Sequence, residues 1–248
     1  MDLQEIRSVI EGSDNIVFFG GAGVSTESGI PDFRSAEGLY VTERNSKVSP
    51  EEILSRDFFL RHPAEFYQFY FAKLIYPDAR PNAAHRALAE LERRGKLRAV
   101  ITQNIDGLHQ AAGSRNVLEL HGSLHRNYCL SCGKPYPLEY VLAHEPGVPH
   151  CEQCGGVVRP DVVLYQETLD ESVLRRSILY ISEADVLIVG GTSLQVYPAA
   201  GLVQYYRGGR MILINKSPTP YDHLANFVIH DSIGRVLESL VGTGEEAP

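Results

Sequence analysis

The four cysteines of the chain fall into two pairs with the spacing of a metal site. Cys129 and Cys132 form the first pair, and Cys151 and Cys154 follow after 18 intervening residues. Two Cys-x-x-Cys pairs supply four thiolates, the ligand set of a closed tetrahedral zinc site. Because no position would stay open for water, we predict one structural Zn²⁺ per chain. A redox-active thiol pair near a nucleotide is the competing interpretation.

A glycine-rich stretch, FFGGAGVSTESGIPDFRS over residues 18–35, follows a short apolar run. The backbone of 21–23, with the hydroxyls of Ser25 and Thr26, can cradle a pyrophosphate. The spacing differs from the Gly-x-Gly-x-x-Gly dinucleotide fingerprint, because Thr26 occupies the place of the third glycine. A plain dehydrogenase is therefore disfavoured. The glycines alone are equally compatible with a tight turn that binds nothing.

His121 is the candidate general base. It closes the apolar run 117–122 and is followed by a glycine. An imidazole titrates near neutral pH and can take up a proton without a metal. On residue type alone, however, a single histidine is more often structural. The stretch TQNID over 102–106 also has a functional and a structural interpretation: it could bind a ligand, or it could form a polar turn.

Apolar strands that alternate with helices must position these residues. We expect strands over 15–19, 97–103, 117–122, 161–165, 184–191 and 210–215, and helices near 3–10, 82–95 and 171–182, after Pro198 and from about 232. Such alternation predicts an α/β fold with a parallel sheet covered on both faces. Ligands bind beyond the carboxyl ends of such strands, where the polar motifs lie.

Two stretches interrupt this rhythm. We interpret them as insertions that form a smaller domain, with a helical module at 36–80 and a zinc module at 123–157. The rest, 1–35, 81–122 and 158–248, is predicted to form a Rossmann-like nucleotide-binding domain.

Composition and charge narrow the class of protein. The 248 residues are 44% hydrophobic and 22% charged, as in an ordinary globular protein, and the formal net charge is −8. A negative balance argues against nucleic-acid binding and mildly favours a cationic partner such as a lysine-bearing peptide. The chain has neither a secretory signal pattern nor the apolar run of a membrane helix, so we expect a cytoplasmic protein.

Taken together, the motifs resemble those of the sirtuins, the NAD-dependent protein deacylases. GAGVSTESGIPDFRS, TQNIDGLH, LHG, the paired Cys-x-x-Cys motifs, GTSLQVYPAA and IN occur in the sirtuin order, over about residues 12–240. The resemblance implies a Rossmann-like sheet with a small zinc-ribbon and helical domain. NAD and an acyl-lysine peptide would meet between the two domains, the peptide adding as a strand.

The resemblance also implies roles for particular residues. His121 would be the base that deprotonates a ribose hydroxyl, with Asn104 as a second catalytic residue, and Phe33 would shield the reactive ribose carbon. Asp32 would hold the shape of its loop, and His109 would be a structural hydrogen-bonding residue. The implied NAD contacts are Gly21, Ala22, Gly23, Thr26, Phe33, Arg34, Gln103, Asn104, Ile105, Asp106, His121, Gly191, Thr192, Ser193, Asn215 and Ile233.

The implied peptide and acyl-lysine contacts are Val163, Tyr165, Gln166, Glu167 and Val196. Many relatives read Phe-Gly-Glu at 165–167, so Gln166 adds a side chain that we expect at the peptide edge. Relatives that prefer acidic acyl groups carry a Tyr-x-x-Arg pair, and here Tyr67 is followed by Tyr70. The missing arginine favours acetyl or longer neutral acyl groups, whereas a shifted register with Lys73 would allow succinyl.

Two other functions stay open at this level. The same NAD site would serve ADP-ribosyl transfer or NAD hydrolysis, and a zinc ribbon could act as a non-enzymatic interaction module. The complete set of motifs at the strand ends favours the deacylase. The sequence makes no prediction of the oligomeric state.

Overall fold

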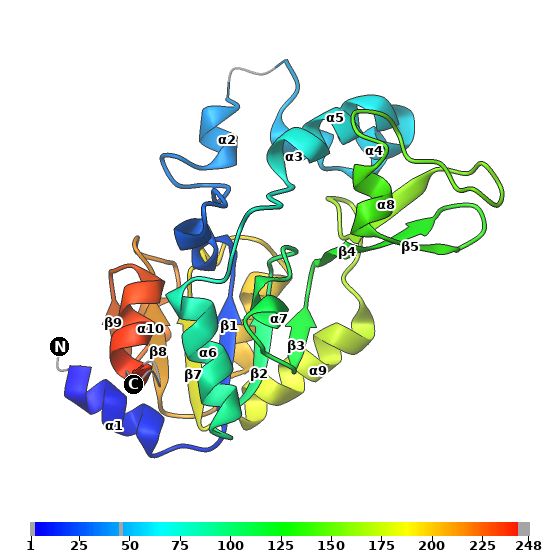
Figure 1. The fold of residues 1–248 in the computed structure, drawn as a ribbon. Coiled ribbons are helices and arrows are strands. Elements are labelled where there is room, and N and C mark those ends of the chain that lie inside the picture. Colours follow the sequence, from blue (N-terminus) through cyan, green and yellow to red (C-terminus); the bar gives the residue numbers. More distant parts are fainter. Residues whose placement is uncertain (1–2, 45–46, 243–248) are drawn as a thin grey trace, which may run out of the picture.

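The computed structural model describes residues 3–44 and 47–242, and a parallel sheet forms its larger lobe (Figure 1). Within these residues, six strands lie in the order β3-β2-β1-β7-β8-β9, and neighbouring strands pair in parallel. The strands are β1 Ile16–Gly20, β2 Leu97–Thr102, β3 Val117–Glu119, β7 Val186–Gly190, β8 Met211–Ile214 and β9 Phe227–Ile229. The strand order reverses between β1 and β7, the place where open α/β sheets bind ligands.

Helices cover both faces of this sheet, as the apolar strands require. Successive side chains of β1 enter opposite cores: Phe18 joins the cluster under one face, and Val17 and Phe19 join the other. The first face is covered by α1 Leu3–Glu11, α6 Ala83–Arg93 and α10 Ile233–Val241, and the second by α9 Glu171–Glu183 and the 3-10 helix η3 Ala199–Tyr205. The predicted α/β fold is confirmed.

Local signals explain where two of these helices begin. The side-chain oxygen of Asn82 accepts the backbone N–H of Ala84 at 2.9 Å, and so caps α6. Gly95 just beyond its end adopts a φ of 76°, which favours glycine. The Asp170 carboxylate caps α9 through two backbone N–H groups. The helix predicted near 82–95 is therefore present, with Asn82 and Gly95 at its two ends.

A second, antiparallel sheet forms the smaller lobe. Its order is β5-β4-β6, with β4 Gly122–Cys129, β5 Pro135–Pro137 and β6 Val158–Val162. Around it lie the short helices α3 Pro50–Ile53, α4 Arg56–Arg61, α5 Pro63–Lys73 and α8 Leu138–Leu142, whereas α2 Leu39–Thr42 lies apart, above the large lobe (Figure 1). Phe66 and Tyr67 of α5 share one buried cluster with Val158 of β6. Both interruptions of the alternating pattern thus pack into one hydrophobic core.

The structure differs from the predicted elements in three places. The strand expected at 161–165 is wrong, because β6 spans 158–162 and pairs with β4 in the second sheet. The run 117–122 contains two elements, since β3 ends at Glu119 and β4 starts at Gly122. The helix after Pro198 is the 3-10 helix η3. In the described part of the chain, no helix is long and apolar enough to cross a membrane.

Candidate active site

The loops after β1, β2 and β7 meet at the carboxyl edge of the large sheet. The backbone N–H of Gln103 donates to Gly20 at 3.0 Å, and its side-chain amide donates to the Thr192 hydroxyl at 3.0 Å. Gly23 donates its N–H to the Gly191 carbonyl at 2.8 Å. Three groups of predicted NAD contacts that lie far apart in the sequence are therefore in direct contact.

Glycine is required where the first and third of these loops approach each other. A Cβ on Gly23 would lie 2.9 Å from backbone atoms of Gly191, closer than real Cβ contacts allow. Gly191 itself has a φ of 58°, in the left-handed region that other residues rarely adopt. The two loops therefore pack backbone against backbone at the carboxyl edge of the sheet.

A buried hydrogen-bond network connects the loop after β1 to the loop after β2. The Ser25 hydroxyl donates to the Asp106 carboxylate at 2.6 Å and accepts the side-chain amide of Asn104 at 3.0 Å. The other oxygen of Asp106 accepts the backbone N–H of Leu108 at 2.9 Å, at the start of α7 Leu108–Ala111. Asn104 and Asp106 are therefore held in fixed orientations.

The two hydroxyls expected to cradle a pyrophosphate both have protein partners. Ser25 is bound into the buried network, and the Thr26 hydroxyl donates to the Gly23 carbonyl at 3.0 Å. Thr26 begins the 3-10 helix η2 Thr26–Ser28 and bonds back to η1 Ala22–Val24, so its hydroxyl stabilises the turn, whereas Ser25 connects the turn to the loop after β2. The backbone N–H groups of Gly23, Val24 and Ser25 are bonded within the protein as well, so a phosphate at this turn would have to contact other backbone groups of the loop.

His121 lies between β3 and β4, with its ring oriented by one backbone contact. Its Nδ1 is 3.0 Å from the carbonyl oxygen of Gln103. A carbonyl only accepts, so Nδ1 carries the hydrogen and Nε2 keeps its lone pair. Burial lowers the pKa of His121, and the hydrogen bond to Gln103 opposes this shift only in part. The imidazole is therefore neutral at pH 7 and able to accept a proton.

The PDFR loop is folded around Asp32. One carboxylate oxygen of Asp32 accepts the backbone N–H groups of Arg34 at 3.1 Å and Ser35 at 2.8 Å, which confirms the predicted structural role. Phe33 packs against the core of the small lobe. The Arg34 guanidinium is exposed and lies 5.2 Å from the centre of the Tyr40 ring.

The segment 163–167 connects the two lobes beside His121. Val163 donates its N–H to the His121 carbonyl at 3.0 Å. Tyr165 donates its N–H to Leu54 and accepts that of Arg56, so this segment pairs with the helical module. The amide oxygen of Gln166 accepts the backbone N–H of Asp57 at 3.0 Å, in the first turn of α4, and its place at the peptide edge stays a prediction.

A buried ion pair fixes the end of this segment. The Arg159 guanidinium donates to both oxygens of Glu167, at 2.7 and 3.0 Å. The same carboxylate accepts the N–H of Leu164 at 2.9 Å. Only 8% of the Arg159 side chain and 18% of the Glu167 side chain are exposed. The pair therefore lies largely out of water, where loss of one partner is costly.

We expect the Arg159→Met substitution to lower the free energy of unfolding by about 2–3 kcal/mol, because it leaves the Glu167 carboxylate largely buried and unpaired. Urea denaturation of the two proteins measures the difference. The matched control is Arg175→Met, whose ion pair with Glu171 has both side chains at least 80% exposed. That change should cost less than about 0.5 kcal/mol. Equal effects of the two substitutions would contradict a stabilising role of the buried pair.

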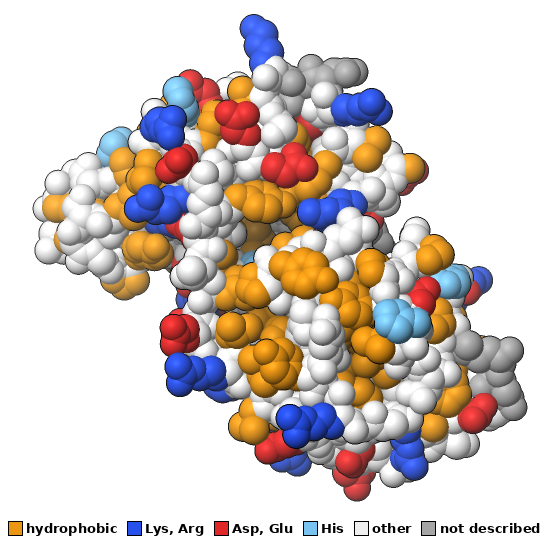
Figure 2. All heavy atoms as spheres, turned by 180° about the vertical axis from the view of Figure 1, so that it is seen from behind, with side chains coloured by type: hydrophobic (Ala, Val, Ile, Leu, Met, Phe, Trp, Pro, Cys, Tyr) orange, Lys and Arg blue, Asp and Glu red, His pale blue; other side chains and the backbone are white. Residues whose placement is uncertain are grey.

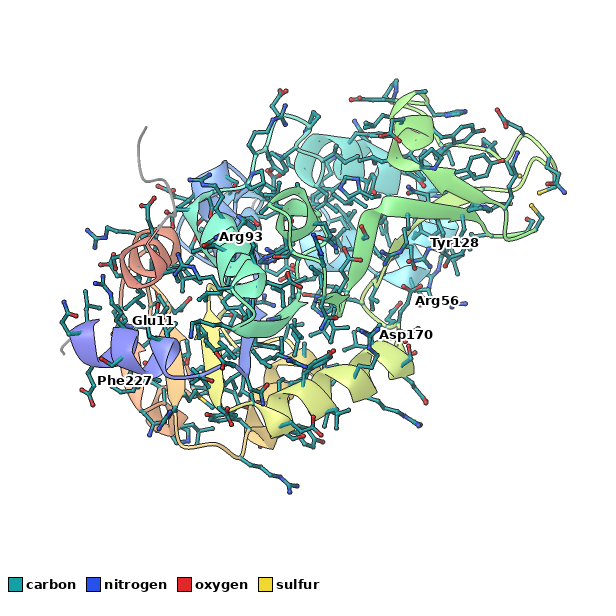
Figure 3. All side chains as sticks on the ribbon, turned by 60° about the horizontal axis from the view of Figure 1, so that its bottom comes forward. Glu11, Arg56, Arg93, Tyr128, Asp170 and Phe227 are labelled. Atoms are coloured by element: carbon teal, nitrogen blue, oxygen red, sulfur yellow. The ribbon has the colours of Figure 1, made fainter. Side chains whose placement is uncertain are left out.

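The four cysteines lie together at the outer end of the second sheet, where sulfur atoms are seen far from the large sheet (Figure 3). Their sulfur atoms all lie within 4.8 Å of one another. The Sγ atoms of Cys129 and Cys154 are 3.4 Å apart, and those of Cys132 and Cys151 are 3.6 Å apart. A tetrahedral zinc ion with Zn–S bonds of 2.3 Å needs a separation of about 3.8 Å. The donor set therefore fits one zinc ion.

Comparison with known proteins identifies the family. A protein-family model described as "Sir2 family" matches residues 21–198. The chain belongs to the Sir2 family. A relative from Clostridium acetobutylicum, named NAD-dependent protein deacetylase, is 59% identical over 239 residues, 96% of this chain and 98% of that protein. One of the same name from Staphylococcus epidermidis is 46% identical, with 98% of each chain covered.

Solved structures of the family share this fold. One described as "Sir2-p53 peptide-NAD+" has a TM-score of 0.85 at 40% identity, and 97% of each chain is covered. Another, described as "Sir2 bound to acetylated peptide", has a TM-score of 0.85 at 38% identity, again with 97% of each chain covered. The resemblance inferred from the motifs is thus confirmed over nearly the whole chain.

Other predicted contacts of this Sir2-family chain lie farther along the same edge. Asn215 follows β8 and is half-buried, with its N–H bonded to Ile229 at 3.0 Å. Val196, beyond β7, is half-buried too. Ile233 is buried in the first core and packs against Gly190. A contact between Ile233 and an adenine ring would therefore have to involve its backbone.

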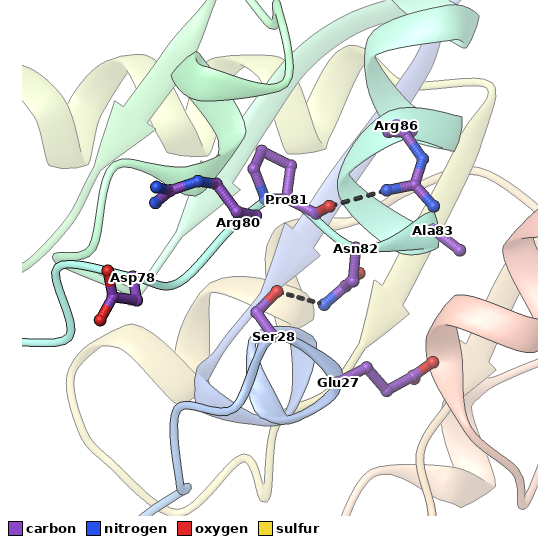
Figure 4. A pocket seen from close by; sticks show the side chains of 8 residues that line it. All are labelled: Glu27, Ser28, Asp78, Arg80, Pro81, Asn82, Ala83 and Arg86. Atoms are coloured by element: carbon purple, nitrogen blue, oxygen red, sulfur yellow. Dashed lines mark hydrogen bonds between the residues drawn. The ribbon is translucent and has the colours of Figure 1, made fainter.

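A separate hollow of about 520 Å³ opens between η2 and the start of α6 (Figure 4). It is lined by Glu27, Ser28, Asp78, Arg80, Pro81, Asn82, Ala83 and Arg86. The Asn82 side chain donates to the Ser28 hydroxyl at 2.9 Å across its floor. None of the predicted NAD or peptide contacts lines this hollow, so it is distinct from the candidate site formed by the loops after β1, β2 and β7.

Two buried histidines lie behind the Asp106 network of the Sir2-family chain. The rings of His85 and His109 are 4.8 Å apart. Both ring nitrogens of His109 are buried without a hydrogen-bond partner among the described residues, so the predicted hydrogen-bonding role is wrong. Burial lowers the pKa of His85 to about 4 and that of His109 to about 3, the latter with a contribution from His85.

This pair should make the protein sensitive to acid. In the unfolded chain each histidine binds a proton near pH 6.5, whereas in the folded chain His85 does so only near pH 4 and His109 near pH 3. The unfolded state binds more protons between these values, so stability falls as the pH falls. We expect a loss of up to about 1.4 kcal/mol per pH unit for each histidine between pH 6.5 and pH 4.

Urea denaturation at several pH values measures this dependence. The His109→Leu substitution removes an unpartnered buried imidazole, so it should make the loss per pH unit smaller without lowering stability at pH 7. His62→Gln, at an exposed histidine, is the control and should leave the pH dependence unchanged. An unchanged pH dependence in His109→Leu would refute the assignment.

Proposed function

We propose that this chain is an NAD-dependent protein-lysine deacylase, which forms free lysine, nicotinamide and O-acyl-ADP-ribose. The place of His121 carries the proposal. Its ring is bonded to Gln103 on the predicted NAD side, and its carbonyl oxygen accepts from Val163 on the predicted peptide side. A base at this junction suits a reaction that needs both ligands at once. Relatives named NAD-dependent protein deacetylase, at 46–59% identity, support it.

NAD is assigned to the place where the loops after β1 and β7 meet, at the reversal of the strand order. A Cβ on Gly21 would lie 3.0 Å from the Thr192 side chain, so glycine allows these two loops to pack closely there. Bound NAD would supply the ADP-ribosyl group that accepts the acyl group as nicotinamide leaves. We assign the phosphates to the loop 21–26 and the adenosine half to 191–193 and Asn215. Gln103 and Asn104 would face the ribose, and Ile105 and Asp106 the nicotinamide.

The residues around His121 can perform the proton transfer. Nε2 is the available acceptor because the Gln103 carbonyl engages Nδ1. A base with a pKa somewhat below neutrality is already unprotonated at pH 7, as general base catalysis requires. The network of Ser25, Asn104 and Asp106 would keep the amide and carboxylate oriented toward the cofactor, which lowers the cost of ordering them during the reaction.

The peptide is assigned to the junction of the two lobes, where the surface is hollowed (Figure 2). An extended peptide could add as a strand between segment 163–167 and the loop that holds Val196. Tyr165 is exposed and Val163 is half-buried, so both are accessible to an acyl-lysine. Glu167 would act through its ion pair, by holding this segment in place.

A neutral acyl group is the best match to the small lobe. The Tyr67 hydroxyl donates to the Val158 carbonyl at 2.6 Å and is therefore occupied. The Tyr70 hydroxyl is buried without a partner among the described residues, and burial raises its pKa, so it stays protonated. Neither supplies the positive charge that a carboxylate on the acyl chain would need. We therefore propose acetyl and longer neutral acyl groups as substrates.

The metal and the domain division complete the proposal. One Zn²⁺ bound by the four cysteines would stabilise the small lobe, with no open position for catalysis. We propose a small domain formed by 36–80 and 122–162, because β6 pairs in the second sheet. The proposed boundary thus lies at 162, whereas the sequence pattern alone suggested 157. The remaining segments form the NAD-binding domain. The four unpaired thiols fit a reducing compartment, so we propose the cytoplasm.

Mass spectrometry of the purified protein with NAD and peptides that carry acetyl-, butyryl- or succinyl-lysine tests the function. We expect O-acyl-ADP-ribose in a one-to-one ratio with free lysine, for the neutral acyl groups. Release of nicotinamide while the peptide stays acylated would favour ADP-ribosyl transfer or NAD hydrolysis. Intact NAD with every peptide would refute the activity.

A further inference from the structure

Tyr40 contacts both sides of the proposed active site. Its ring lies 5.3 Å from that of Phe33 and 5.2 Å from the Arg34 guanidinium, the two residues of the PDFR loop assigned to NAD. Its hydroxyl lies 2.8 Å from that of Tyr165, on the segment assigned to the peptide. These groups are 125 residues apart in the sequence. A single side chain therefore joins the cofactor loop to the peptide segment.

On the cofactor side, Tyr40 moves with the loop. Its backbone N–H donates to Phe33 at 2.9 Å, and that of Leu39 donates to Asp32 at 2.8 Å. The start of α2 is thereby bonded to the PDFR turn. Residues 34–37 are exposed, so few packing contacts hold this part of the loop against the protein. A hydrogen bond from Tyr40 to another segment therefore adds appreciably to its fixation.

On the peptide side, Tyr165 is fixed by its backbone. Its N–H donates to Leu54 at 2.9 Å, and its carbonyl accepts from Arg56 at 3.0 Å. The ring projects from this anchored backbone and is 37% exposed. Burial, followed by the bond to Tyr165, raises the pKa of Tyr40. The Tyr40 hydroxyl therefore stays protonated, and the two hydroxyls share a neutral hydrogen bond.

We propose that the hydroxyl pair of Tyr40 and Tyr165 couples the binding of the cofactor to the binding of the acyl-peptide. The bond favours the state in which the PDFR loop and the Tyr165 ring both hold the positions seen in this structure. A ligand that stabilises either half of this state therefore stabilises the other half, so each ligand raises the affinity for the other. Tyr40 and Tyr165 are then positioning residues of the two sites. This inference rests on the proposed function.

Isothermal titration with ADP-ribose tests the coupling, since this probe lacks nicotinamide and undergoes no turnover. Its Kd is measured alone and with a saturating acetyl-lysine peptide, and the ratio of the two values is the coupling. We expect a ratio above one in the unsubstituted protein. Tyr40→Phe and Tyr165→Phe should each lower it about two- to tenfold, the effect of one neutral hydrogen bond.

The double variant should resemble either single variant, because each removes the same bond. Tyr180→Phe is the matched control, as it removes a hydroxyl that accepts from Asn116 at 2.9 Å on α9, and it should keep the full ratio. A ratio of one in the unsubstituted protein, or an equal or higher ratio in the Phe variants, would overturn the coupling alone. Failure of the unsubstituted protein to bind ADP-ribose and peptide would overturn the proposed function as well.

Discussion

The His121→Ala substitution is expected to lower kcat for deacylation by about 10²–10⁴-fold, the usual contribution of a positioned general base. The reason is the geometry of its ring. Gln103 holds Nδ1 at 3.0 Å, so Nε2 is available, and burial keeps the pKa of His121 below its ordinary value. Since the group is active when unprotonated, the rate should fall on the acidic side with a midpoint below pH 6.5.

Steady-state assays with acetyl-lysine peptide and NAD measure this loss, and titration with ADP-ribose verifies that the variant still binds. The matched control is His144→Ala, which also loses a ring-to-carbonyl contact, to Tyr140 at 2.8 Å on α8. It should stay within about threefold of the unsubstituted protein, because that contact lies in the small lobe away from His121. A His121→Ala variant within tenfold of normal kcat would eliminate His121 as the base.

Removal of zinc should abolish activity and unfold the small lobe while the large sheet persists. Cys129 and Cys151 belong to the third hydrophobic cluster, whereas the two clusters on the faces of the large sheet contain no cysteine. Binding of a structural zinc ion supplies about 10–16 kcal/mol in zinc-finger peptides. Loss of even part of that energy exceeds what a short three-stranded sheet can replace.

A chelator and the Cys151→Ser variant test this in two ways. Metal analysis should find one zinc ion per chain before treatment, and hydrogen exchange should show lost protection in β4–β6 but retained protection in β1 and β7. Added zinc should restore activity after chelation but not in the variant. The control Ser182→Ala changes an exposed hydroxyl on α9 and should change none of these values. Full activity without zinc would contradict the structural role.

Much of the candidate site could be predicted because its residues follow strands directly. The glycine loop, Gln103 and Gly191 each come after an apolar run, and parallel strands place their ends at one edge. Zinc binding could be predicted for a related reason, since the ligand spacing is local. In both cases the information lies within a few consecutive residues.

The parts that were missed depend on contacts between distant residues. Whether β6 joins the parallel sheet or pairs with β4 is decided by register across some 30 residues. Ser25 could be seen in the glycine loop, but its bond to Asp106 spans 81 positions. The sequence does not identify Arg159 as a functional residue, because its contribution to stability depends on being buried beside Glu167. The bond from the Asp57 N–H to the Gln166 side chain likewise joins residues 109 positions apart, at a residue with a φ of 74°.

The position of strand β4 limits where Sir2-family sequences can gain or lose residues. It begins one residue after His121 and ends at the first cysteine, and it pairs with β5 on one side and β6 on the other. From Asn127 to Cys129 the strand is paired without interruption with β6, so one inserted or deleted residue there would exchange its two faces and rotate the metal module relative to the base. The turn 143–148 after α8 contains no paired strand. Natural variation in chain length should therefore accumulate in this turn and be absent between Asn127 and Cys129.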